Sequence, residues 1–344
     1  MTHFPADPPP KRRGRTFLQR GLRGLAGVAL LLVGLLLLLA YWPQPPISQL
    51  YRPAAPAPYA ETVAQLQREA RQAGPQVEPA CRAGLLLHGH RTERVFVLMH
   101  GFTNCPAQFR QFGELLFRQG HNVLIPRLPF HGQRDRLTDD PLRLTAPMLL
   151  QAANEAVDRA RALGRRVTVV GLSINGTVAV WLAGHRADLD EVVLLAPFLA
   201  PVGLPEWAVA PAARLAGRLP NTWQWWDSKA KARGGNGYSY PRFPTHALAE
   251  VLRLSGELLG EARTTGPRCG SVLVVTTGAD RNADPALTRT LLERWRRHRP
   301  EAIRAYEFPA AQQVDHDFID PSSPVQRIEL VYPKLLALLE DEKR

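Results

Sequence analysis

The chain has 344 residues, of which 45% are hydrophobic and 22% are charged, and its formal net charge is +12. This length and apolar fraction suit one large domain or two small ones with an ample core. Beyond the first residues the basic excess is dispersed and rich in arginine, without the aromatic-interleaved basic patch of a nucleic-acid site, so we expect no nucleic-acid partner.

The start of the chain joins a basic segment to an apolar one. Residues 1–24 carry six basic residues against one acidic residue, and residues 25–41 then contain no charge. At about 1.5 Å per residue this run approaches the thickness of a hydrocarbon core, and Tyr41 and Trp42 stand where interfacial aromatic residues belong. We therefore expect a transmembrane anchor over residues 25–42, with residues 1–24 in the cytoplasm.

This topology places the rest of the chain in the periplasm or outside the cell. The arginine and proline content favours a bacterial source, so we expect a single-pass protein of the inner membrane. A cleaved signal peptide ending near Ala40 is the alternative, although Leu38 is not the small residue that cleavage favours.

Residues 43–82 are expected to form a proline-rich linker with a short helix. Six prolines between positions 43 and 58 predict a stiff, extended spacer. Residues 59–72 have the pattern of an amphipathic helix.

A folded domain is expected from residue 83. Residues 83–88 and a turn at 89–91 predict an initial hairpin, in which His88 and His90 lack a third ligand at metal-binding spacing. Apolar, β-branched runs then alternate with amphipathic stretches, which predicts a largely parallel sheet with helices on both faces. The expected strands cover 94–99, 122–125, 167–170, 191–196, 271–277 and 302–308, and the expected helices include 108–119, 147–163 and 285–297.

A sharp turn between strand and helix is expected at residues 171–176. The β-branched run that ends at Val170 predicts a buried strand, and the apolar stretch from Thr177 predicts a helix. Ser173 lies at the apex of the turn, as the nucleophile of a nucleophile elbow does. That pattern places Gly where Asn175 stands here, with Gly176 one residue later. An ordinary turn that merely contains a serine is the alternative.

Four polar clusters fall where expected strands end. They are the run His100-Gly101-Phe102, then Ser173, Asp280 and His316. In parallel sheets with helices on both faces, chemistry collects at the carboxyl ends of the strands. These side chains are therefore the candidate site.

Three motifs resemble the α/β-hydrolase fold, and within it the carboxylesterase and monoacylglycerol-lipase-like serine hydrolases. They are MHGFTNCPAQF, LIPRLPFHG and VVGLSINGTVAVWLA, and the likeness extends over about residues 83–340. The departures are Asn175, Phe130 where the second motif usually has Gly, and Cys105 where a small residue is common. The resemblance implies a core of residues 83–199 and 269–344, with residues 200–268 inserted as a cap or lid.

In this fold the catalytic residues follow the order Ser, acid, His, because a serine hydroxyl needs a base that a third group orients. Ser173 is then the nucleophile and His316 the base. Asp280 is the expected acid, and Asp284, which precedes a proline like a helix cap, is the alternative. His298 also follows Asp280, but it stands in an arginine-rich helix end.

The resemblance also implies an oxyanion hole and a pocket. The expected oxyanion donors are the backbone N–H groups of Phe102 and Ile174. His100 is expected to buttress the loop beside the pocket, and Asn175 and Phe130 lie near that pocket.

The expected cap holds several tryptophans, and the chain holds an odd number of cysteines. The tryptophans at 207, 223, 225 and 226 either present aromatic surface to an acyl chain or fill the core of the cap. Of Cys81, Cys105 and Cys269, at most two can pair, and the sequence leaves the pairing open.

The sequence therefore predicts a membrane-anchored serine hydrolase that cleaves carboxylic esters, with a small ester or a lipid as substrate and no metal or organic cofactor. A lipid-directed acyltransferase or amidase of the same fold is the alternative. A non-catalytic binding protein is a third interpretation.

Overall fold

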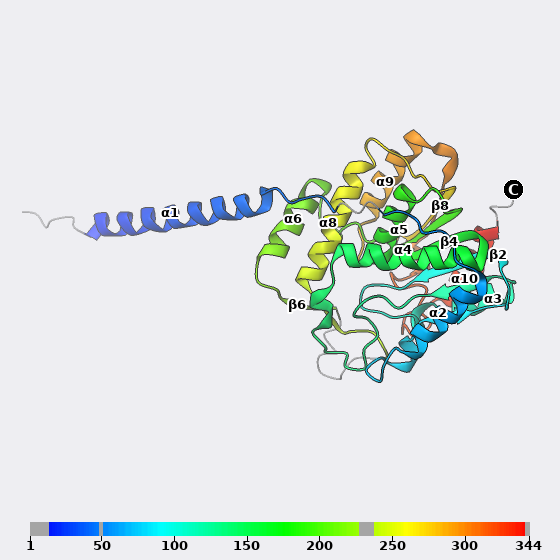
Figure 1. Cartoon of the computed structure of the whole chain (residues 1–344). Coiled ribbons are helices and arrows are strands. Elements are labelled where there is room, and N and C mark those ends of the chain that lie inside the picture. Colours follow the sequence, from blue (N-terminus) through cyan, green and yellow to red (C-terminus); the bar gives the residue numbers. More distant parts are fainter. Residues whose placement is uncertain (1–13, 48–50, 227–236, 341–344) are drawn as a thin grey trace, which may run out of the picture. The chain divides into compact units, whose positions relative to one another are not determined.

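The computed structural model describes residues 14–47, 51–226 and 237–340, and the chain divides into residues 1–43 and residues 44–344 (Figure 1). In the first unit, helix α1 (Gly14–Tyr41) is 28 residues long. Its charge-free part, residues 25–41, is about 26 Å long at about 1.5 Å per residue, against about 30 Å for a hydrocarbon core. Among the described residues, no helix is both long and apolar enough to span a membrane. The predicted anchor is therefore not supported, and residues 1–13 of the predicted basic segment lie outside the described residues.

The second unit is built on a seven-stranded sheet. Its spatial order is β1-β3-β2-β4-β5-β8-β9, and every neighbouring pair is parallel except β1 with β3. The predicted parallel sheet is thus confirmed. The strands are β1 (Gly84–Leu86), β2 (Thr92–Met99), β3 (Asn122–Ile125), β4 (Gly164–Leu172), β5 (Glu191–Leu195), β8 (Ser271–Thr277) and β9 (Ile303–Phe308).

The predicted initial hairpin is wrong, because β1 pairs with β3, Gly84 lying opposite Ile125. Strand β2 has β3 on one side and β4 on the other, so neither of its edges is free for β1. The turn between β1 and β2 is held by the Asn122 side chain, which accepts from the His88 N–H at 2.8 Å and donates to the His90 carbonyl at 2.8 Å.

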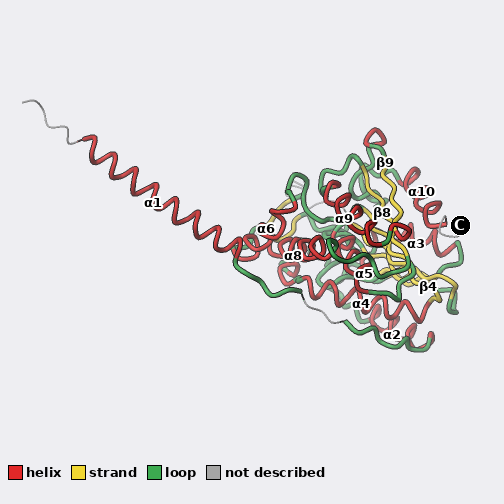
Figure 2. Tube along the Cα trace, turned by 90° about the horizontal axis from the view of Figure 1, so that it is seen from above, coloured by secondary structure: helices red, strands yellow, loops and turns green. Residues whose placement is uncertain are grey.

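Helices cover both faces of the sheet (Figure 2). Alternate residues of β2 point to opposite faces, as the pleat requires. Val95, Val97 and Met99 join the apolar core that α4, α5 and α9 cover, whereas Phe96 and Leu98 join the core under α3 and α10. The helices of this unit outside the cap are α2 (Tyr59–Arg71), α3 (Ala107–Arg118), α4 (Ala146–Leu163), α5 (Ile174–His185), α9 (Pro285–His298) and α10 (Ile328–Glu340), and only α10 has no counterpart among the predicted elements.

The segment predicted as a cap lies between β5 and β8. It contains α6 (Glu206–Arg218), α8 (Thr245–Glu261) and an antiparallel pair of short strands, β6 (Trp223–Trp225) and β7 (Arg242–Pro244). Residues 227–236 of this segment lie outside the described residues.

The four cap tryptophans differ in exposure. Trp207 and Trp226 are exposed. Trp223 and Trp225 are partly buried, and the Arg242 guanidinium lies 4.0 Å and 5.8 Å from their ring centroids.

A disulfide joins Cys81 to Cys105, and Cys269 is a buried free thiol. Cys81 closes the short 3-10 helix η1 (Pro79–Cys81), and Cys105 lies three residues after Phe102. The bond therefore ties the segment before the sheet to the loop that follows β2.

Candidate active site

Ser173 lies at the sharp turn between β4 and α5. Its backbone has φ 58° and ψ −119°, a conformation that is costly for a non-glycine residue, and its N–H donates to the Leu195 carbonyl at 3.0 Å. A Cβ on Gly171 would lie 2.1 Å from the Asn175 carbonyl oxygen, and one on Gly176 would lie 2.6 Å from Cα of Pro197. Gly171 and Gly176 are therefore the positions at which the turn has no room for a side chain. Asn175 needs no left-handed conformation, because it lies within α5.

The structure brings Ser173, His316 and Asp280 together at the carboxyl ends of the strands. Nε2 of His316 lies 2.9 Å from the Ser173 Oγ, and its Nδ1 lies 2.8 Å from Oδ2 of Asp280. The Asp280 Oδ1 accepts from the N–H groups of Asn282 and Ala283 at 2.8 Å and 3.0 Å. The ring of His316 is thus held between a hydroxyl and a carboxylate that is itself fixed by the backbone.

The two alternatives to these residues lie elsewhere. Asp284 caps α9, where its Oδ1 accepts from the Ala286 N–H at 2.8 Å. His298 is the last residue of the same helix. Neither side chain has a hydrogen bond to His316 or Ser173 in the described part of the chain.

The electrostatics of the pair favour an ionised Asp280. Burial alone would raise the pKa of this carboxyl, but the hydrogen bond and charge of His316, together with the backbone hydrogen bonds from Ala283 and Asn282, outweigh burial and hold the pKa below its ordinary value. For His316, burial lowers the pKa, but Asp280, Asp317 and Asp315 together reverse the effect and raise the pKa above its ordinary value. This is the direction that the two flanking aspartates predict.

The two backbone N–H groups expected to form the oxyanion hole belong to Ile174 and Phe102. The N–H of Ile174 belongs to the first residue of α5 and has no acceptor within the helix. Phe102 follows Gly101 in the loop after β2, and its carbonyl lies 2.5 Å from Nε2 of His131 in the second motif. Neither N–H donates to an acceptor among the residues that the structure describes, so both are free to donate to a ligand.

The predicted pocket residues differ in their exposure. His100 and Asn175 are completely buried, so they lie behind the surface of the site and not on it. The His100 Nδ1–H donates to the Gly101 carbonyl at 2.9 Å, as a buttress would, and burial lowers the pKa of its imidazole well below the ordinary value. Phe130 is partly exposed and has φ 65°, which accounts for the glycine usual at this position.

Gln108 is a site residue that sequence reasoning missed. Its Oε1 accepts from the Gly101 N–H at 2.8 Å, and its Nε2 lies 3.5 Å from Oδ1 of Asp317. The sequence pattern could have indicated it, because Gln108 is a polar residue on the same helical face as the buried Phe112 and Leu116.

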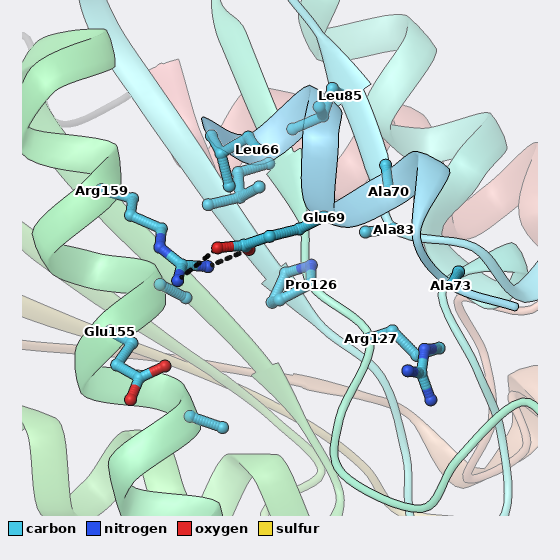
Figure 3. Close-up of a pocket in the computed structure, with 13 residues that line it drawn as sticks. Leu66, Glu69, Ala70, Ala73, Ala83, Leu85, Pro126, Arg127, Glu155 and Arg159 are labelled. Atoms are coloured by element: carbon cyan, nitrogen blue, oxygen red, sulfur yellow. Dashed lines mark hydrogen bonds and ion pairs between the residues drawn. The ribbon is translucent and has the colours of Figure 1, made fainter. Parts of the chain in front are cut away.

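Two further features of the described chain bear on the choice of site. No group of three or more His, Cys, Asp or Glu side chains gathers there to hold a metal ion. A pocket between α2 and α4 is lined by apolar side chains and by the charged residues Glu69, Arg127, Glu155 and Arg159 (Figure 3). Arg159 donates to both carboxylate oxygens of Glu69 at 2.8 Å and 3.0 Å. None of the residues around Ser173 lines the pocket.

Residues 95–328 match the alpha/beta hydrolase family. The chain is similar to a thermostable monoacylglycerol lipase from Bacillus sp. (strain H-257), with 29% identity over 161 residues, which are 47% of this chain and 61% of the relative. The match therefore spans less than two thirds of the length of that relative.

Solved structures share the fold at low identity. One comes from work on LipS and LipT, two metagenome-derived lipolytic enzymes, with a TM-score of 0.56, 18% identity, and coverage of 77% of this chain and 100% of the other. Another is the monoacylglycerol lipase of Paleococcus ferrophilus, with a TM-score of 0.55, 18% identity, and coverage of 75% and 97%.

Proposed function

Since this chain belongs to the alpha/beta hydrolase family, we propose that it is a serine hydrolase of carboxylic esters. The observation that carries the proposal is the chain of hydrogen bonds from the Ser173 Oγ through the His316 ring to the Asp280 carboxylate. A serine hydroxyl is a weak nucleophile, and a positioned base that a carboxylate orients is what activates it.

In the proposed mechanism, Ser173 attacks the ester carbonyl while His316 takes the hydroxyl proton on Nε2. The N–H groups of Phe102 and Ile174 stabilise the resulting oxyanion. The carbonyl re-forms, the alcohol leaves with the proton from His316, and an acyl-serine remains. Water attacks this acyl-enzyme with His316 as base again, which releases the acid and restores Ser173. Asp280 keeps the ring oriented and stabilises the imidazolium throughout.

A monoacylglycerol or similar lipid ester is the substrate class that we favour. The relative from Bacillus is named a monoacylglycerol lipase. The Phe102 and Phe243 rings, from the loop after β2 and from β7, have centroids 5.4 Å apart and supply apolar surface beside the proposed oxyanion donor. Such surface suits an acyl chain better than a charged substrate.

We also propose that the catalytic unit works in an oxidising compartment. The disulfide between Cys81 and Cys105 is the support for this, because such bonds persist in oxidising compartments and are rare in the cytosol.

The test of function is a panel of p-nitrophenyl esters and monoacylglycerols of graded acyl length, with and without an added alcohol or amine as acyl acceptor. We expect free acid as the main product for at least one ester. Predominant transfer to the acceptor would indicate an acyltransferase, and turnover of amides alone would indicate an amidase. If the protein neither turns over any substrate nor is labelled by a fluorophosphonate, the result would indicate a non-catalytic binding protein.

The pH dependence of kcat/KM should follow the protonation of His316. We expect kcat/KM for a neutral ester to fall as the pH drops through the pKa of His316, because the protonated ring accepts no proton from Ser173. Since that pKa is raised, the midpoint should lie above the ordinary value of about 6.5. Asp280→Asn removes the carboxylate that raises it, so the midpoint should move to lower pH, and kcat should fall by about 10³- to 10⁴-fold.

The matched control for that experiment is Asp284→Asn, which changes the carboxylate that caps α9. It should keep the wild-type midpoint and rate. An Asp280 variant with the wild-type profile would argue against its assignment as the acid.

A further inference from the structure

The loop His100-Gly101-Phe102 at the end of β2 is held by side chains from two other elements. The inference drawn from this rests on the proposed function. If Phe102 supplies an oxyanion donor, the orientation of the Gly101–Phe102 peptide decides where that donor points. A trans peptide is planar, so its N–H points away from its own carbonyl. Whatever fixes the Gly101 carbonyl therefore aims the Phe102 N–H.

The Gly101 carbonyl is fixed by two donors on one side. It accepts from Nδ1 of His100 at 2.9 Å and from the backbone N–H of Asn104 at 3.2 Å. The Phe102 N–H must then point to the opposite side. This arrangement holds only while the preceding peptide, between His100 and Gly101, keeps its own orientation.

Both ends of that preceding peptide are bound by side chains from outside the loop. Nδ2 of Asn175, in the first turn of α5, donates to the His100 carbonyl. Oε1 of Gln108, in α3, accepts from the Gly101 N–H at 2.8 Å. Asn175 stands two residues after Ser173, so this contact ties the nucleophile turn directly to the loop.

Space filling alone does not account for an asparagine at position 175. Asn175 is completely buried, and its Oδ1 has no hydrogen-bond partner among the described residues. A buried amide oxygen without a partner costs stability, so the side chain is an unfavourable choice for filling space. Among the residues that the structure describes, the side chain's one hydrogen bond is the one to the His100 carbonyl.

We propose that Asn175 and Gln108 are positioning residues that hold the His100–Gly101 peptide and thereby aim the Phe102 N–H at the oxyanion formed beside Ser173. Asn175 ties the loop to the nucleophile turn. Gln108 ties it towards the loop of His316, since its Nε2 lies 3.5 Å from Asp317. The nucleophile, the base and the oxyanion donor are thus kept in mutual register.

The test compares Asn175→Ala and Gln108→Leu with Asn154→Ala in the full chain. Asn154 is an equally buried asparagine in α4, which donates to the Leu150 carbonyl at 2.9 Å and lies outside the site. The readouts are kcat and KM for p-nitrophenyl butyrate, the midpoint of thermal unfolding, and the affinity for a trifluoromethyl ketone, which forms a tetrahedral adduct with the serine.

We expect each site variant to lower kcat by roughly 10- to 100-fold with KM within about twofold of wild type, and to weaken the ketone in proportion. Asn154→Ala should lower the unfolding midpoint and keep kcat. Asn175→Ala should keep its midpoint close to wild type, because it also removes the unpaired Oδ1.

Wild-type kcat and ketone affinity in a folded Asn175→Ala would overturn the proposal, even if Gln108→Leu does not fold. A kcat loss without weaker ketone binding would equally overturn it, because the oxyanion would then be bound normally. A wild-type enzyme that hydrolyses no ester would instead refute the proposed function, and this inference with it.

Discussion

Replacing Ser173 by alanine is expected to lower kcat/KM for every ester substrate by about 10⁴-fold or more and to abolish covalent labelling by a fluorophosphonate. The reason is that His316 has no other hydroxyl within hydrogen-bonding distance in the described chain. The loss should appear in kcat, because the remaining groups still bind substrate. The measurements are steady-state hydrolysis of p-nitrophenyl butyrate and mass spectrometry of the labelled protein.

Ser255→Ala is the matched control for this substitution. Ser255 is a buried serine in α8 whose hydroxyl donates to the Leu199 carbonyl. Its removal should leave labelling intact while the stability decreases slightly. Labelling that persists in Ser173→Ala would show that another residue is the nucleophile.

Much of the sheet could be predicted because its strands are buried on both faces. Strands such as β5 and β8 form nearly continuous apolar runs, and the helices between them are long enough to show their own period. The strand ends then locate Ser173, Asp280 and His316 without any knowledge of side-chain direction. The strand ends, together with the order Ser, acid, His that the resemblance implies, therefore predicted three side chains that the structure brings within hydrogen-bonding distance.

The contacts that sequence reasoning missed are between residues far apart in the chain. A hairpin of β1 with β2 is compatible with every local signal, and only the presence of β3 and β4 on both edges of β2 excludes it. Likewise, nothing local shows that Asn175 turns towards His100 and away from a substrate. The pairing of Cys81 with Cys105 also depends on how distant segments of the chain come together in the fold.

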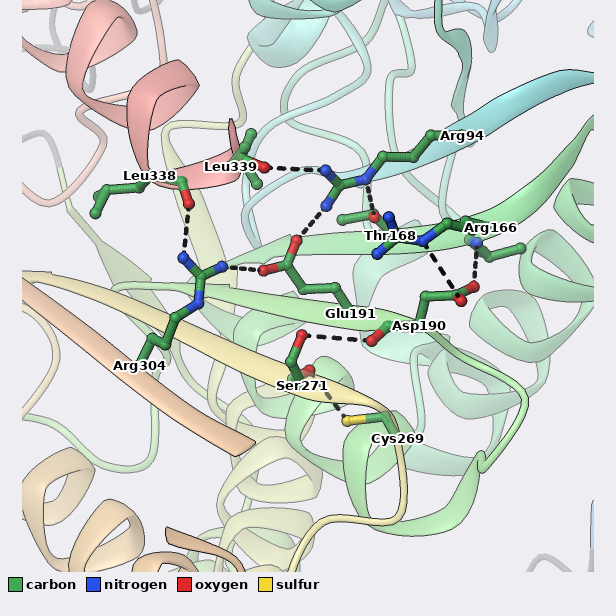
Figure 4. A network of polar contacts seen from close by, with 11 residues as sticks. Arg94, Arg166, Thr168, Asp190, Glu191, Cys269, Ser271, Arg304, Leu338 and Leu339 are labelled. Carbon is green, nitrogen blue, oxygen red and sulfur yellow. Dashed lines mark hydrogen bonds and ion pairs between the residues drawn. The ribbon is translucent and has the colours of Figure 1, made fainter. Parts of the chain in front are cut away.

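A buried ion cluster at the opposite ends of the strands from the site also escaped prediction (Figure 4). The carboxylate of Glu191, the first residue of β5, contacts the guanidinium groups of Arg94 in β2 and Arg304 in β9. Each arginine also donates to a carbonyl at the end of α10: Arg94 to Leu339 at 3.0 Å and Arg304 to Leu338 at 2.8 Å. In the sequence, Glu191 looks only like a polar residue before an apolar strand.

Glu191→Gln is expected to lower the free energy of unfolding by about 3–5 kcal/mol, because it removes the charge of a buried carboxylate that contacts the buried Arg94 and the partly exposed Arg304. Glu191 and Arg94 are both buried, so water cannot take over the lost interaction. The control is Glu307→Gln, which removes an exposed carboxylate 3.7 Å from Arg289 and should change the unfolding free energy by about 1 kcal/mol at most. Both values come from urea denaturation followed by circular dichroism. Because the cluster lies far from Ser173, the folded Glu191 variant should keep wild-type kcat, and equal destabilisation by the two substitutions would show that the cluster does not stabilise the sheet.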